Sequence, residues 1–171
     1  MDVKKSTKIV SISIAVLFLA TAALWLINGG GARYDGDGSV IVFSDNGDTV
    51  CEADLEYIKG FDTEKFETTI RSSVLKPTDV EYKGVLLKNL FSVMGISLED
   101  KTRVVVKGID GYQAFLSMEE LDKKDIYIAY EMDGKPLKPK EKGGFGPFQL
   151  VIPGDPYSQR WCKFVCEVCV I

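Results

Sequence analysis

The sequence predicts an α+β domain, a mixed β-sheet with a few short helices, preceded by one transmembrane helix. Two observations predict the domain: strand-like apolar runs outnumber helical ones, and Asn-Gly or Asp-Gly pairs follow several of them. A third observation predicts the membrane helix, because a long run without charge, Ile9 to Ile27, follows the first lysines. With 171 residues, 46% hydrophobic and 27% charged, the chain is large enough for one well-packed core.

The N-terminal segment, residues 1–28, is predicted to be a signal anchor in the cell membrane. Lys4 and Lys5 precede an uncharged run from Ile9 to Ile27. As a helix this run spans about 28 Å, which fits a hydrocarbon core of about 30 Å. Trp25 near its far end is typical of the membrane interface. Because positive flanks stay in the cytoplasm, we expect a single-pass protein with an extracytoplasmic C-terminal domain.

A cleaved signal peptide is the alternative, because Ala20-Thr21-Ala22 has the form of a cleavage site. The domain would then be secreted. Cleavage there would leave the apolar residues 23–27 at the start of the mature chain, which favours the uncleaved anchor. Residues 29–39 are rich in Gly and Asp and are predicted to be a flexible linker, so the folded domain is expected over residues 40–171.

Strands and turns are predicted from alternation, β-branched content and turn residues. Asn46-Gly47 and Asp133-Gly134 are tight-turn signals. In chain order, the predicted strands are residues 40–43, 65–72, 103–109, 126–132, 148–152 and 161–170.

Three short helices are predicted between these strands. The first covers residues 53–59 and is closed by Gly60. The second covers residues 84–96, where apolar residues recur at helical spacing up to a stop at Gly95. The third begins at a capping box, with Ser117 as N-cap and Glu120 three residues later.

Five motifs of the predicted domain occur in a fixed order. They are Tyr82-Lys83-Gly84-Val85 before a Leu-rich helix, Asp110-Gly111-Tyr112, the run from Ile128 to Leu137, the run from Gly144 to Pro153, and Trp161-Cys162-Lys163. In this order they resemble the oxidoreductase molybdopterin-binding domain family over residues 55–170. The resemblance implies a barrel-like sheet of the sulfite-oxidase fold, a molybdopterin cofactor and redox chemistry.

The resemblance also implies where a cofactor or anionic ligand would bind. Two arginines would bind anionic groups, glycine N–H groups would hold a phosphate, and Ser72 would face the ligand centre. The residues expected to converge on this pocket are Arg71, Ser72, Ser73, Asp110, Gly111, Tyr112, Gly144, Gly146 and Arg160. A plainer interpretation assigns the glycines to turn geometry and Tyr112, Tyr130 and Trp161 to the core or its rim.

The chain departs from the family pattern where the metal is bound. The family ligates molybdenum through a cysteine thiolate, but residues 68–73 contain no cysteine and the chain contains no histidine. Gln149 stands where the family often has an arginine. The N-terminus also lacks the twin arginines used to export proteins already loaded with cofactor. The sequence therefore predicts no metal ligand and leaves the catalytic residues open.

Two functions follow from these observations. One is an extracytoplasmic oxidoreductase of the molybdopterin type. The other is a non-catalytic module on the same fold that binds a small anionic ligand or a partner protein. Nucleic-acid binding is not expected, because no basic patch is interleaved with aromatic residues and the net charge is -4.

Four cysteines, Cys51, Cys162, Cys166 and Cys169, form an even set in a domain expected outside the cytoplasm, which is compatible with disulfides. On one extended strand Cys162 and Cys166 would be about 13 Å apart, too far to bridge. Buried apolar thiols and a zinc site that uses Cys51 are the alternatives.

Overall fold

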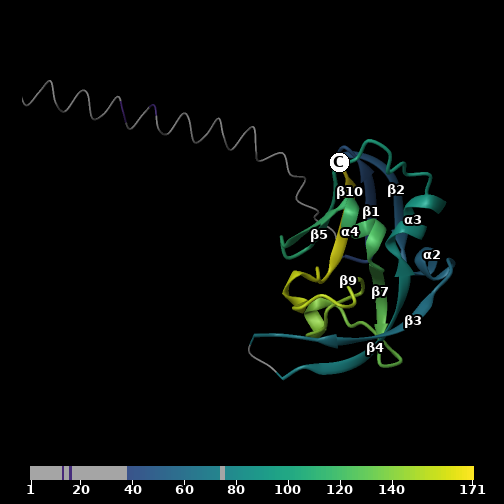
Figure 1. Ribbon diagram of the computed structural model, residues 1–171, viewed down its shortest axis with the longest axis vertical. Coiled ribbons are helices and arrows are strands. Elements are labelled where there is room, and N and C mark those ends of the chain that lie inside the picture. The colour runs from purple at the N-terminus through teal and green to yellow at the C-terminus, as the bar shows by residue number, and fades with distance from the viewer. Residues whose placement is uncertain (1–12, 14–15, 17–37, 74–75) are drawn as a thin grey trace, which may run out of the picture. The chain divides into compact units, whose positions relative to one another are not determined.

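The computed structural model describes residues 38–73 and 76–171, together with Ser13 and Val16 (Figure 1). Apart from Ser13 and Val16, the predicted anchor lies outside these residues, as do the cleavage site after Ala22 and nearly all of the predicted linker. No helix within the described ranges is long and apolar enough to cross a membrane. The domain described below belongs to the unit Asp35–Ile171.

The first sheet contains the two ends of the domain. Its strand order is β2 (Asp48–Asp54), β1 (Val40–Asp45), β10 (Val165–Val170), β5 (Arg103–Gly108) and β6 (Gln113–Ser117). The pair β1–β10 is parallel and the other pairs are antiparallel. Asn46 and Gly47, both with positive φ, form the tight turn between β1 and β2, as their sequence predicts.

The second sheet carries the long β3–β4 hairpin seen in Figure 1. Its order is β3 (Glu64–Ile70), β4 (Thr78–Leu86), β7 (Tyr127–Met132) and β8 (Lys135–Pro136), and β9 (Gln149–Val151) also pairs with β7. Each of these pairs is antiparallel. Neither sheet closes on itself, so the prediction of a barrel-like sheet was wrong: the domain is mostly β, with two open sheets and few short helices.

The helices α2 and α4 each begin where a local side chain caps them. In α2 (Leu55–Lys59) the Asp54 side chain accepts from the N–H of Tyr57 at 2.8 Å. In α4 (Met118–Lys123) both bonds of the predicted Ser117–Glu120 capping box are present. The predicted start of α2 at Ala53 was two residues too early, because Ala53 still pairs with Ile41 in β2.

The predicted helix over residues 84–96 was wrong at its start. The helix α3 is Leu87–Val93, and residues 84–86 belong to β4. Gly84 lies against β7 so closely that a Cβ there would be 2.6 Å from the carbonyl oxygen of Ile128. The helix ends at Val93, and Gly95, two residues later, has a positive φ of 70° and acts as the predicted stop.

The predicted last strand also began too early. Phe164 has a positive φ of 55°, which bends the chain, so β10 starts only at Val165. Cys162 therefore lies before the strand, and the spacing argument that separated it from Cys166 does not apply. The four cysteines are free thiols, with Cys51 half-buried and the others buried.

The core forms from apolar side chains of both sheets and the helices. Its largest fully buried members include Phe43 and Phe91, whose rings meet edge to face, and Tyr82 and Phe148. Two 3-10 turns, η1 (Lys140–Lys142) and η2 (Ser158–Arg160), lie in the long connections on either side of β9. These connections carry the candidate site.

Candidate functional site

A cleft of about 350 Å³ lies where four separated segments meet. These are the end of β3, the loop before β9 with the first residue of that strand, η2 and the segment that leads to β10. The residues that line it are Ile70, Arg71, Ser72, Phe145, Gln149, Ser158, Gln159, Trp161 and Lys163. Its volume falls at the lower end of the range for small-molecule sites, roughly 300–1,000 Å³.

Two hydrogen bonds between Arg71 and Ser158 fix one wall of the cleft. The N–H of Arg71 donates to Ser158 Oγ at 2.9 Å, and the N–H of Ser158 donates to the carbonyl oxygen of Arg71 at 2.9 Å. This pair joins the strand end that carries Ser72 to η2. The cleft therefore has a defined edge between two segments that are distant in the sequence.

Gln149 is a buried polar residue of the cleft, with 3% of its surface exposed. Its Oε1 accepts a hydrogen bond from the Tyr82 hydroxyl at 3.2 Å. Burial, followed by the charge of Asp133, raises the pKa of Tyr82 to about 12, so the phenol stays a neutral donor. Because the amide oxygen is used in this bond, the NH₂ group is the end of Gln149 that remains for a ligand.

Trp161 supplies a buried donor. Its ring is 3% exposed and packs edge to face on Tyr82, with 6.3 Å between the ring centroids. The indole Nε1–H is buried and has no hydrogen-bond partner within the described chain. A buried donor without an acceptor costs free energy, so this N–H in a cleft-lining residue points to an acceptor supplied from outside the protein.

The charged groups of the cleft are cations. Arg71 and Lys163 line it, and no aspartate or glutamate of the described residues does. Neither cation forms an ion pair within the described part of the chain. Lys163 Nζ lies 4.2 Å from the centroid of the Phe145 ring, a cation–π contact. The cleft can therefore attract a small anion.

Of the residues predicted for the site, the structure brings Arg71 and Ser72 to the cleft. Ser73 is exposed and does not line it. The predicted Asp110-Gly111-Tyr112 segment forms a turn beside the cleft, in which Asp110 Oδ1 accepts from the N–H of Tyr112 at 3.1 Å and Gly111 has a φ of 84°. The Tyr112 hydroxyl donates to the carbonyl oxygen of Gln159 at 3.1 Å. Tyr112 thus supports η2 from outside the cleft.

Gly144 and Gly146 serve close backbone packing. A Cβ on Gly144 would be 2.0 Å from the carbonyl oxygen of Lys138, and one on Gly146 would be 2.4 Å from Leu137 Cβ. Their N–H groups donate to the carbonyl oxygens of Pro139 and Lys138, at 3.2 and 2.8 Å. These two N–H groups are therefore committed within the protein and do not point to a phosphate cradle.

Arg160 is held in an ion-pair cluster away from the cleft. Its guanidinium donates to Glu120 at 2.6 Å and to Asp155, whose side chain is 2% exposed. Lys124 Nζ also contacts both carboxylates, at 3.1 and 3.0 Å. The hydrogen bond from Arg160 is the main reason that the pKa of Glu120 falls to about 2. Arg160 ties α4 to the β9–η2 connection, and its charge is already balanced.

Seven cleft residues were not among the predicted site residues: Ile70, Phe145, Gln149, Ser158, Gln159, Trp161 and Lys163. Gln149 carried a local signal, because it is one polar residue in the apolar run of residues 148–152. Lys163 and Ser158 carried none, since only the turn before β10 and the Arg71 contact bring them to the cleft.

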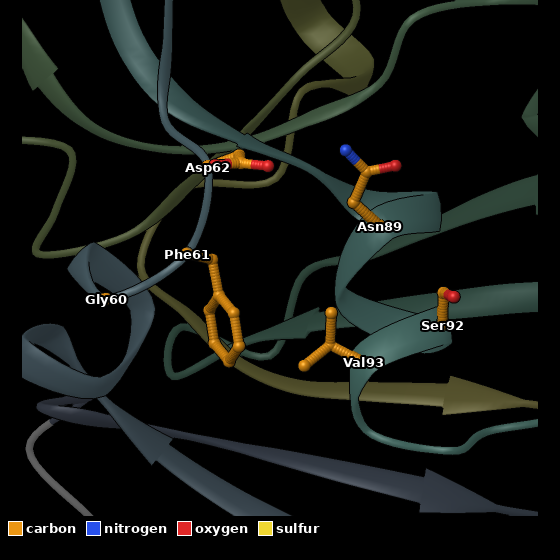
Figure 2. A pocket seen from close by; sticks show the side chains of 6 residues that line it. All are labelled: Gly60, Phe61, Asp62, Asn89, Ser92 and Val93. Carbon is orange, nitrogen blue, oxygen red and sulfur yellow. The ribbon is translucent and has the colours of Figure 1, made fainter.

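A second cavity, of about 340 Å³, lies between the end of α2 and α3 (Figure 2). Figure 2 shows the Phe61 ring directed toward Val93, with Asp62 and Asn89 to one side. It contains none of the predicted site residues. No group of three or more His, Cys, Asp or Glu side chains among the described residues could hold a metal ion.

Comparison with known proteins agrees with the resemblance seen in the motifs. The family model for the oxidoreductase molybdopterin binding domain matches residues 57–171. Among solved structures, the sulfane dehydrogenase SoxCD from Paracoccus pantotrophus has a TM-score of 0.63 and 17% identity over 81% of this chain. The match spans 39% of that SoxCD chain and shows a common sulfite-oxidase-like fold. No curated protein matches the chain. The chain therefore belongs to the oxidoreductase molybdopterin binding domain family.

Proposed function

We propose that this domain is a binding module that takes a small oxyanion into the cleft around Trp161. The observation that carries the proposal is the buried indole N–H of Trp161, which lacks an acceptor in the described chain. It belongs to a cleft whose charged lining residues are Arg71 and Lys163. An oxyanion there would accept from Trp161 and Gln149 and be neutralised by the two cations.

The residues that line the cleft lack the thiolate ligand that a thiolate-bound molybdenum requires. None of the four cysteines lines the cleft. Burial raises the pKa of Cys162 to about 12 and that of Cys166 to about 11, so both remain protonated thiols near neutral pH. Ser72, which lines the cleft, offers a hydroxyl, a harder and more weakly acidic ligand. The residues present therefore do not fit a molybdenum ligated by a protein thiolate.

A molybdopterin-type redox function is the second candidate, and family membership favours it. Arg71 and Lys163 would suit an anionic group of such a cofactor, while the metal would have no cysteine ligand. The two candidates are separated by purifying the full chain from cells that make molybdenum cofactor, then measuring bound molybdenum and released pterin fluorescence. Stoichiometric metal and pterin would overturn the non-catalytic proposal. Folded protein without either would support it.

We also propose that the module faces the outside of the cell, anchored by the run from Ile9 to Ile27. The lysines before this run and its uncharged length support the proposal. The test is a Ser39→Cys variant treated in intact cells with a membrane-impermeant thiol reagent, with the parent chain as the control for its own cysteines. Extra labelling of the variant is expected. Labelling that appears only after cell lysis would overturn the outward orientation.

The binding proposal is tested with inorganic phosphate and sulfate, titrated calorimetrically into the full chain in detergent. Trp161→Phe keeps the ring but removes the donor, and the expected loss of affinity is about tenfold, the size of one charge-assisted hydrogen bond. Tyr57→Phe, an exposed ring on α2 outside the cleft, is the matched control. The proposal is overturned if neither anion binds, or if both variants bind like the parent chain.

A further inference from the structure

A third cavity, of about 330 Å³, borders the cleft and shares Phe145 with it. We name it the lysine hollow, because Lys135 and Lys138 line it beside the apolar side chains of Met132, Pro136 and Leu137. Asp133 also lines it, and its Oδ1 accepts a hydrogen bond from the N–H of Glu81 at 3.0 Å. Because Phe145 lines both, the cleft and the lysine hollow meet at this residue. Because the two cavities adjoin at Phe145, one ligand with two chemically different parts could occupy both.

The lysine hollow is suited to an apolar ring with an anionic substituent nearby. Met132, Pro136, Leu137 and Phe145 give it apolar walls, and flat apolar groups pack well against such side chains. Lys135 and Lys138 form no ion pair among the described residues, while most other described lysines do. Cations without an ion-pair partner among the described residues thus line both cavities, Lys135 and Lys138 in the lysine hollow and Arg71 and Lys163 in the cleft.

The backbone around Phe145 is held in place. The Phe145 carbonyl oxygen accepts from the N–H of Phe164 at 3.0 Å, and the N–H of Gly146 donates to Lys138 at 2.8 Å. Gly144 and Gly146 pack directly against residues 137 and 138. The ring itself is half-buried and lies under Lys163. Phe145 is therefore a fixed boundary against which a ligand in either cavity would pack.

From this arrangement we infer that the ligand is an aromatic oxyanion. Its oxyanion occupies the cleft beside Trp161, Arg71 and Lys163, and its ring packs on Phe145 and extends into the lysine hollow. This inference rests on the proposed function, since it assigns the oxyanion to the same cleft and adds a site for the rest of the ligand. It names aryl phosphates, sulfates and sulfonates as the ligand class.

The test compares 4-nitrophenyl phosphate with inorganic phosphate on the full chain in detergent, by calorimetry. The aryl phosphate is expected to bind at least about tenfold more tightly, because the ring buries apolar surface on Phe145. Phe145→Ala is expected to bring the two affinities together and to leave that for phosphate within about threefold. Phe115→Ala, an exposed phenylalanine on β6 outside both cavities, is the matched control and should keep the difference.

A second variant protects the test against a folding defect of Phe145→Ala. Met132→Ala removes a side chain that lines the lysine hollow but not the cleft, so it should weaken the aryl phosphate and leave phosphate unchanged. Equal affinities of the parent chain for the two probes would overturn the inference and leave the proposed function standing. Tight aryl phosphate binding that neither variant weakens would also overturn it. Failure of both probes to bind would overturn the proposed function itself.

Discussion

Arg71 and Ser158, 87 positions apart in the chain, exchange two hydrogen bonds of 2.9 Å. One uses the Ser158 hydroxyl as acceptor and the other uses only backbone atoms. The contact holds the end of β3 against η2, next to Ser72 and Trp161, which both line the cleft. Ser158 thus joins two segments that border the cleft, through its hydroxyl and its backbone N–H.

Replacing Ser158 with Ala should loosen this edge. The variant loses the acceptor for the Arg71 N–H, and the expected cost is about 1 kcal/mol in the free energy of unfolding, typical of one hydrogen bond. Phosphate binding should weaken at the same time, because Arg71 is then held by one hydrogen bond in place of two. Urea unfolding and calorimetry measure the two effects. Ser92→Ala, an exposed serine on α3, is the control, and equal effects of both substitutions would contradict the prediction.

The ion-pair cluster around Arg160 predicts a dependence of stability on acid. In the folded state the pKa of Glu120 is lowered from 4.5 to about 2, chiefly by the Arg160 hydrogen bond. A carboxyl with a depressed folded pKa stabilises the fold above its unfolded pKa, and this contribution is lost as the pH falls through the folded value. The stability difference between the parent chain and Glu120→Gln should therefore be constant above pH 5 and shrink between about pH 4.5 and pH 2.

Unfolding by urea at a series of pH values measures this difference. Glu119→Gln is the matched control, because Glu119 lies on the same helix but its side chain is 73% exposed and pairs with the exposed Lys123. A difference for Glu120→Gln that stays constant down to pH 2 would show that Arg160 does not hold the carboxylate in solution.

Asp155 should be the most sensitive position of the same cluster. Its carboxylate is 2% exposed and contacts both Arg160 and Lys124. Asp155→Asn keeps the shape but leaves two cations without this charge, and breaking a buried pair costs roughly 3–5 kcal/mol; because Arg160 and Lys124 are partly solvated, about 3 kcal/mol is expected. The free energy of unfolding in urea is the measurement. Asp122→Asn, exposed on α4, should change it by less than about 0.5 kcal/mol.

The sequence predicted those parts of the fold that depend on neighbouring residues. The Asn46-Gly47 turn and the Ser117–Glu120 capping box form from side chains a few positions apart, and both are present. The family resemblance also pointed to Arg71 and Ser72, and both line the cleft. Lys163 escaped prediction because its place at the cleft depends on the bend at Phe164. Gln149 was noted only as the replacement of a family arginine, since its position at the cleft depends on the pairing of β9 with β7. Arg160 looked like an anion binder in sequence, since nothing local reveals that Asp155 and Glu120 already hold it.

Gly84 is the clearest case in which tertiary contact overrides a local pattern, and it provides the last prediction. The helical spacing of leucines extended back to this residue, yet Gly84 is in β4 opposite Ala129 of β7. A Cβ would be 2.6 Å from the Ile128 carbonyl oxygen and 2.8 Å from Ala129 Cα, and both are backbone atoms that cannot move separately from the sheet. Gly84→Ala should therefore destabilise the domain by about 3 kcal/mol, at the upper end of overpacking effects, although alanine is the better helix former. Urea unfolding measures this loss beside the control Gly60→Ala, whose Cβ would be 3.2 Å from the Tyr57 carbonyl oxygen. The control should destabilise the domain less. A stable Gly84→Ala protein would mean that β4 and β7 are farther apart in solution than described.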